Sequence, residues 1–131
     1  IDISPTLIGL ARERSAGACG AGYVEFRVGD MLDPVFGRFD HIVAMDSLIH
    51  YAPHDAADAA SSLARRARGS LVFTFAPRTP ALAAMHAVGR LFPRGDRAPA
   101  IEPVTPDGMH ALLETRLRTT GRRLGRTQRV S

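Results

Sequence analysis

The chain has 131 residues, a net charge of +4, and basic residues that are all arginine. Apolar residues make up 45% of the sequence, which suits one packed domain, and no apolar run is long enough to span a bilayer. Cys19 is the single cysteine, which excludes a disulfide framework and a multi-cysteine metal site and favours a reducing cytoplasm.

The first helix is predicted at residues 5–16. Ser4 can cap it, and Pro5 suits its first position. Apolar and polar residues alternate over 24–28, which predicts a short strand, and 41–45 is largely apolar, which predicts a buried one. Because the chain starts without Met inside an apparent strand end, we expect a partial domain that is inactive by itself.

The middle of the chain predicts a helix followed by a strand. Asp55 is expected to cap a helix that runs to Arg68 and is closed by Gly69. Residues 71–75 form a nearly continuous apolar run, which is typical of a strand covered on both faces.

The last third predicts a helix over 80–91 and a Pro-rich loop or lid over 92–103. A helix over 106–119 and a strand over 123–130 follow. Strands that alternate with helices in this order indicate an α/β fold, with a parallel sheet and helices on both faces.

Three acidic residues close successive predicted strands: Asp2, Asp30 and Asp46. In open α/β sheets, ligands bind at the carboxyl ends of the strands. A carboxylate after one strand can accept both ribose hydroxyls of a nucleotide, and the next can accept from an adenine amino group. The series therefore favours a nucleoside cofactor. The alternative is that these residues only form turns and caps, since aspartate is common in both.

Five segments then resemble a known family. Their residues are Asp2–Pro5, Phe26–Met31, Phe39–Tyr51, Phe73–Pro80 and Gly89–Pro103. The first three are similar to motifs of class I S-adenosylmethionine-dependent methyltransferases, which implies a Rossmann-like sheet. The last two, with the end of the third, resemble the magnesium-protoporphyrin IX O-methyltransferase family of bacteriochlorophyll synthesis. The resemblance covers nearly the whole chain, 1–131, as a partial methyltransferase domain that lacks the first strand and the glycine-rich turn.

The resemblance implies S-adenosylmethionine as cofactor and a propionate carboxylate of magnesium protoporphyrin IX as methyl acceptor. The implied cofactor-binding residues lie at the strand ends: Asp2, Ile3, Asp30, Met31, Met45 and Asp46. The glycines around Cys19 do not replace the missing turn, because they follow a helix rather than a strand.

On the substrate side, His50 is the expected catalytic residue, because it lies just past the strand that ends near Asp46. In the implied site it could hydrogen-bond the propionate or approach the substrate's magnesium as an axial imidazole ligand, and its alternative role is packing or capping in a loop. Substrate binding is assigned to Tyr51 and to the arginines Arg78, Arg94 and Arg97, which can pair with the unreacted propionate or be plain surface charge. No metal site is expected, and the remaining histidines are interpreted as structural: His41, His54, His86 and His110.

Other functions remain open at this point. A class I methyltransferase could act on another small acceptor such as a quinone precursor, and a basic α/β module could bind nucleic acid or a protein without catalysis. The expected partners are magnesium protoporphyrin IX as substrate and a magnesium chelatase subunit that hands it over, without nucleic acid. The expected location is the cytoplasm, with peripheral contact to photosynthetic membranes.

Overall fold

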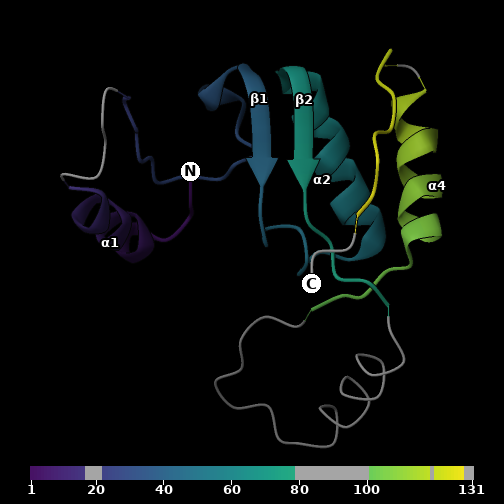
Figure 1. Cartoon of the computed structure of the whole chain (residues 1–131), viewed down its shortest axis with the longest axis horizontal. Helices are drawn as coiled ribbons and strands as arrows, with labels where there is room; N and C mark the ends of the chain where they lie inside the picture. The colour runs from purple at the N-terminus through teal and green to yellow at the C-terminus, as the bar shows by residue number, and fades with distance from the viewer. Residues whose placement is uncertain (17–21, 79–100, 119, 129–131) are drawn as a thin grey trace, which may run out of the picture. The chain divides into compact units, whose positions relative to one another are not determined.

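A computed structural model describes residues 1–16, 22–78, 101–118 and 120–128 (Figure 1). The chain forms two compact units, Ile1–Gly37 and Arg38–Ser131. The first holds helix α1 (Pro5–Ser15) and the short 3-10 helix η1 (Pro34–Phe36). The second holds strand β1 (Phe39–Ala44), helix α2 (Pro53–Arg66), strand β2 (Ala67–Phe73) and helix α4 (Pro106–Leu117).

The first unit is built around one helix and one parallel bridge. Helix α1 begins as predicted, because the Ser4 hydroxyl accepts a hydrogen bond from the Leu7 N–H at 3.3 Å. Asp2 bridges Val28 in parallel, with the Asp2 N–H on the Arg27 carbonyl at 3.1 Å. The strand predicted over 24–28 is therefore wrong as a regular element. Its parallel pairing is confined to this single bridge.

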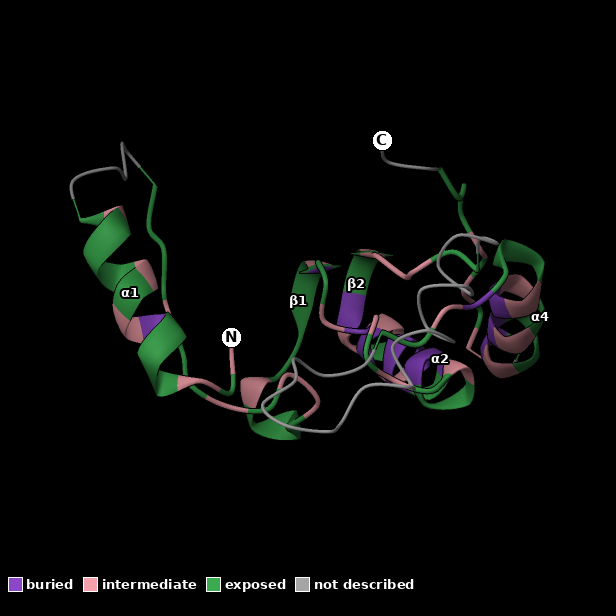
Figure 2. Ribbon diagram, turned by 90° about the horizontal axis from the view of Figure 1, so that it is seen from below, coloured by how far each residue is buried: buried purple, intermediate pink, exposed green. Residues whose placement is uncertain are grey.

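The second unit is a β-α-β arrangement, as the sequence predicted. Strands β1 and β2 pair in parallel, with Ala44 opposite Phe73 at their carboxyl ends. Helix α2 connects the two strands and packs against both. Its buried face is made almost entirely of small side chains, which let it approach the sheet closely: Ala56, Ala57, Ala59, Ala60, Ser61 and Leu63. Figure 2 shows this buried band along α2.

The boundaries of α2 differ from the prediction at both ends. The helix starts at Pro53, so Asp55 lies in its first turn rather than at its cap. It ends at Arg66, and Gly69 belongs to β2 instead of closing the helix. The reason for Gly69 is tertiary, because a Cβ there would come within 2.6 Å of the His41 ring.

Helix α4 packs on α2 and confirms the prediction of a helix after Thr105, whose hydroxyl accepts from the Gly108 N–H at 3.1 Å. Its contact face is apolar and buried: Met109, Leu113 and Leu117. At the helix surface, Arg116 pairs with Asp58 of α2 and donates to the His54 carbonyl at 3.3 Å. The hydrogen bond from the Arg116 guanidinium to the Asp58 carboxyl holds the pKa of that carboxyl below its ordinary value.

The strand predicted over 123–130 is wrong for the described residues 123–128, which form no strand. The Arg122 side chain instead binds the first carbonyls of β2, those of Ala67, Arg68 and Gly69. A guanidinium thus satisfies three consecutive carbonyls at the start of β2. The helix predicted over 80–91 and most of the lid over 92–103 lie outside the described residues.

One face of the two-stranded sheet is covered by α2, while on the other Val43 and Val72 pair with 66% and 55% of their surface exposed. The sequence predicted that the strand over 71–75 is covered on both faces. In the described part of this unit, only the face toward α2 is covered. None of the helices in the described residues is long and apolar enough to cross a membrane.

Candidate functional site

In the first unit, the parallel bridge brings two of the predicted cofactor residues to one strand edge. The Gly29 N–H donates to the Asp2 carbonyl at 2.9 Å, so Asp2 lies beside the chain that leads directly into Asp30. Each carboxylate also serves a local turn: Asp2 Oδ1 accepts from the Ser4 N–H at 2.7 Å, and Asp30 Oδ1 from the Leu32 N–H at 2.8 Å. The turn role and a ligand role are compatible, because a carboxylate has two oxygens and about four acceptor sites.

Two of the three apolar residues assigned to the cofactor, Ile3 and Met31, lie next to these carboxylates along the chain. Ile3 is exposed and Met31 is half-buried. Gly29 shapes this turn, because a Cβ there would lie only 2.5 Å from the Phe36 ring. Glycine at this position lets the aromatic ring pack directly on the backbone before Asp30.

In the second unit, Asp46 follows β1 with a backbone φ of 52°, the left-handed region that few residues other than glycine adopt. Its N–H donates to Oγ1 of Thr74 at 2.7 Å, and the same hydroxyl donates to Asp46 Oδ1 at 3.1 Å. Two hydrogen bonds to one side chain thus hold this residue at the carboxyl ends of β1 and β2.

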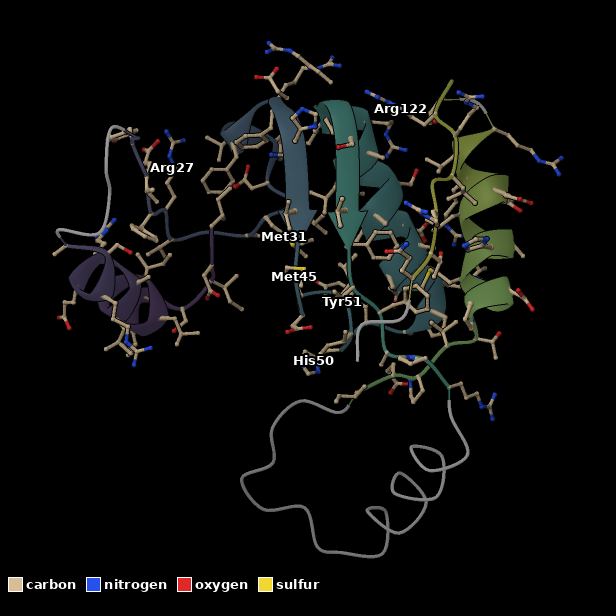
Figure 3. The ribbon with its side chains drawn as sticks, in the orientation of Figure 1. Arg27, Met31, Met45, His50, Tyr51 and Arg122 are labelled. Carbon is tan, nitrogen blue, oxygen red and sulfur yellow. The ribbon has the colours of Figure 1, made fainter. Side chains whose placement is uncertain are left out.

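The chain then turns tightly and presents His50 and Tyr51. The Tyr51 N–H donates to the Leu48 carbonyl at 3.2 Å, and Leu48 is only 1% exposed, which anchors the turn in the core. Figure 3 shows His50 and Tyr51 below the arrowheads of β1 and β2, on the same side as Met45. His50 and Met45 are exposed and Tyr51 is half-buried, so all three can be reached from solvent.

Two further segments reach this edge of the sheet. The Glu102 N–H donates to the Ile49 carbonyl at 2.9 Å, which ties residue 102 to the turn before His50. Pro77 bridges Val104 in parallel, and the Arg78 N–H donates to the Val104 carbonyl at 3.1 Å. The predicted substrate residue Arg78 is therefore exposed at this edge, whereas Arg94 and Arg97 lie outside the described residues.

Other histidines have structural partners. The His41 ring bonds the Ser70 hydroxyl at 2.9 Å, and the His110 ring bonds the Thr127 hydroxyl at 2.6 Å. Within residues 1–16, 22–78, 101–118 and 120–128, no group of three or more His, Cys, Asp or Glu residues is arranged to hold a metal ion.

Sequence reasoning missed two residues that shape these edges, Thr74 and Gly29. Thr74 interrupts the apolar run Phe73–Phe75, and a hydroxyl at a strand end is the signal that was available. Its partner is 28 residues away, so the pairing itself could not be read from the sequence.

Comparisons with known proteins agree with the predicted resemblance. Residues 44–131 match the family described as magnesium-protoporphyrin IX methyltransferase C-terminus. A magnesium-protoporphyrin O-methyltransferase of Rhodobacter capsulatus is 46% identical over 103 residues, which cover 79% of this chain and 46% of that protein. A protein of the same description from Synechocystis is 32% identical over 92 residues, which cover 70% of this chain and 40% of the relative.

A solved structure is similar as well. The crystal structure of magnesium protoporphyrin IX methyltransferase from Synechocystis with bound SAH matches with a TM-score of 0.68 at 26% identity, over 87% of this chain and 50% of that one. This match confirms the predicted Rossmann-like α/β class. The chain spans about half the length of the relatives it matches. The chain belongs to the magnesium-protoporphyrin IX methyltransferase family.

Proposed function

We propose that the protein containing this chain transfers a methyl group from S-adenosylmethionine to a propionate carboxylate of magnesium protoporphyrin IX. The observation that carries this proposal is the structural similarity, over 87% of the chain, to a relative solved with SAH bound. SAH is what remains of S-adenosylmethionine after the methyl group has left.

The described residues fit the nucleoside part of this cofactor. Asp2 and Asp30 offer carboxylate acceptors on the two segments that the Asp2–Val28 bridge joins, suited to ribose hydroxyls and to an adenine amino group. Each uses one oxygen on its own turn, which fixes the orientation of the carboxylate before any ligand arrives. In the proposal Ile3 and Met31 pack against the base, and Met45 and Asp46 are assigned to the cofactor as well.

When bound, S-adenosylmethionine supplies a methyl group on a positively charged sulfur. The propionate oxygen forms the new O–C bond, and the electrons of the broken C–S bond stay on the sulfur. The acceptor carboxylate is already ionised at neutral pH, so no strong general base is required. The protein's task is therefore to align the reacting atoms and to remove water from the carboxylate.

His50 is the residue proposed beside the reacting carboxylate, because the anchored turn presents it at the carboxyl edge of the sheet (Figure 3). Its ring can donate a hydrogen bond that orients the propionate. Tyr51 offers a half-buried ring to pack against the macrocycle, and Arg78 offers an exposed cation at the same edge for the second propionate. In the proposal, Arg94 and Arg97 also pair with the second propionate.

The cellular context extends the proposal. A magnesium chelatase subunit is the proposed source of the substrate, and the proposed location is cytoplasmic with peripheral contact to photosynthetic membranes. Both follow from the acceptor, a planar macrocycle with two carboxylates that is poorly suited to free diffusion in water.

The test is methyl transfer by the full-length protein with a panel of acceptors. We expect esterification of magnesium protoporphyrin IX with a kcat/KM at least about a hundred-fold above that for a quinone precursor, as a site shaped for one acceptor should give. Equal rates would favour a methyltransferase of different specificity. Absence of any transfer, combined with salt-sensitive binding to nucleic acid, would favour a non-catalytic basic module.

A further inference from the structure

Thr74 occupies a particular place in the second unit, directly after β2. Its N–H donates to the Ala44 carbonyl at 3.2 Å, which continues the ladder of β1 and β2 by one step. The backbone of Thr74 is therefore fixed by the sheet. Its hydroxyl is presented to the chain that leaves β1.

That hydroxyl makes both of its hydrogen bonds to one residue. It accepts from the Asp46 N–H at 2.7 Å and donates to Asp46 Oδ1 at 3.1 Å. A hydroxyl has one donor and can accept at the same time, so no other side chain of similar size except serine can replace it. Valine has the same shape as threonine and can make neither bond.

The residue held in this way is in a conformation that needs support. Asp46 has a φ of 52°, which side chains other than glycine rarely adopt and which aspartate tolerates better than most. The next residue adds a local bond, from the Ser47 hydroxyl to the Met45 carbonyl at 3.0 Å. The turn that carries His50 and Tyr51 starts from this point.

We propose that Thr74 is a positioning residue for methyl transfer, whose hydroxyl sets the conformation of Asp46 and so the path of the turn to His50. The inference rests on the proposed function, since it assumes that Asp46 and His50 face the reacting groups. Thr74 uses only Oδ1 of the Asp46 carboxylate. It thereby orients the second oxygen, Oδ2, rather than blocking the whole group.

The experiment compares Thr74→Val with Thr74→Ser in the full-length protein. Steady-state kinetics with magnesium protoporphyrin IX gives kcat and KM, calorimetry gives the affinity for SAH, and thermal unfolding gives Tm. Thr115→Val is the matched control, because the Thr115 hydroxyl bonds only the Ala111 carbonyl within α4, at 3.0 Å. If Thr74→Val is not recovered folded, Thr74→Ala removes the same two bonds with a smaller side chain.

We expect Thr74→Val to lower kcat and SAH affinity about ten-fold each, the loss typical of a hydrogen bond to a charged group. Thr74→Ser should retain both values within about two-fold, and Thr115→Val should match the wild type. In an Asp46→Ala background the effect of Thr74→Val should shrink to the part carried by the N–H of residue 46, because that replacement removes the carboxylate bond and keeps the backbone bond.

Two results would overturn the inference while leaving the proposed function intact. One is wild-type kcat and SAH affinity in Thr74→Val. The other is equal loss in Thr74→Ser and Thr74→Val, which would make Thr74 a packing residue. Failure of the proposed function is separate and visible in the wild type, as an absence of methyl transfer to magnesium protoporphyrin IX.

Discussion

The replacement Asp2→Asn separates the two roles that the structure allows for Asp2. Asparagine keeps an Oδ1 acceptor for the Ser4 N–H, a bond that is 2.7 Å long in the native chain, and so preserves the start of α1. It removes the negative charge and one acceptor oxygen. The change therefore acts on a bound ribose and not on the local turn.

The expected loss of SAH affinity follows from the hydrogen bonds that the replacement weakens. A hydrogen bond to a charged group contributes about 1.5–3 kcal/mol, and each 1.4 kcal/mol is a ten-fold change in affinity. Asp2→Asn should therefore weaken SAH binding by roughly ten- to a hundred-fold. The Tm should stay within about 1–2 °C of the wild type, because surface changes that keep a cap alter stability little.

The assay is calorimetric titration of the full-length protein with SAH. Asp33→Asn is the matched control in the same unit, since Asp33 Oδ1 caps η1 through the Val35 N–H at 2.8 Å and has no proposed ligand role. Its affinity should equal that of the wild type. Unchanged SAH affinity in Asp2→Asn would refute the ribose assignment and leave Asp2 as a turn residue only.

Four further outcomes are expected. Leu48→Ala should lower the free energy of unfolding by about 2–5 kcal/mol in chemical denaturation, because this 1%-exposed side chain anchors the turn before His50; a loss below about 1 kcal/mol would contradict that anchoring. Because the hydrogen bond from Arg116 lowers the pKa of Asp58, the pair stabilises the fold above pH ~4 and its contribution is lost as the pH falls through the lowered pKa. Thermal unfolding of Asp58→Asn between pH ~6 and ~2.5 should then show a gap to the wild type that closes in acid, and a constant gap would contradict the pairing. His50→Ala should reduce kcat more than it alters KM, and wild-type turnover would make His50 a packing residue. Arg97→Ala should raise KM with kcat little changed, as uniform binding of the anionic edge requires, and an unchanged KM would make it surface charge.

Helix starts could be predicted because their signals are local. Ser4 and Thr105 cap α1 and α4 through N–H groups only three residues away, and Pro follows each of them. Helix α2 starts at Pro53 without a side-chain cap, because Ala52 occupies the capping position. The sequence instead predicted Asp55 as the cap. Local sequence signals therefore predicted the starts of α1 and α4 correctly and the start of α2 incorrectly.

Features that depend on distant contacts could not be predicted. Gly69 was predicted to end a helix, yet it lies inside β2, where a Cβ would come within 2.6 Å of the His41 ring. Arg122 directly precedes the strand predicted over 123–130, and in the structure its side chain binds carbonyls more than fifty residues earlier in the chain. The link between Thr74 and Asp46 is of the same kind, because sequence patterns do not report side-chain pairs across a sheet.

The positions of the candidate residues relative to the sheet were predicted more fully than their local geometry. Asp46 and His50 were assigned from a strand end, and Arg78 was assigned from the pairing of arginine with a propionate. The structure brings the segments that carry all three to the carboxyl edge of β1 and β2. The sequence did not predict the features that hold these residues in place, which include the burial of Leu48 and the left-handed backbone of Asp46. These depend on packing and on backbone torsion, which composition and periodicity do not encode.

A crystal structure of the full-length protein with SAH bound tests the cofactor assignment directly. Both ribose hydroxyls are expected to lie within hydrogen-bond distance of the Asp2 carboxylate, with the adenine beside Asp30 and Met31. A nucleoside bound away from these strand ends, with Asp2 and Asp30 engaged only in their own turns, would contradict it.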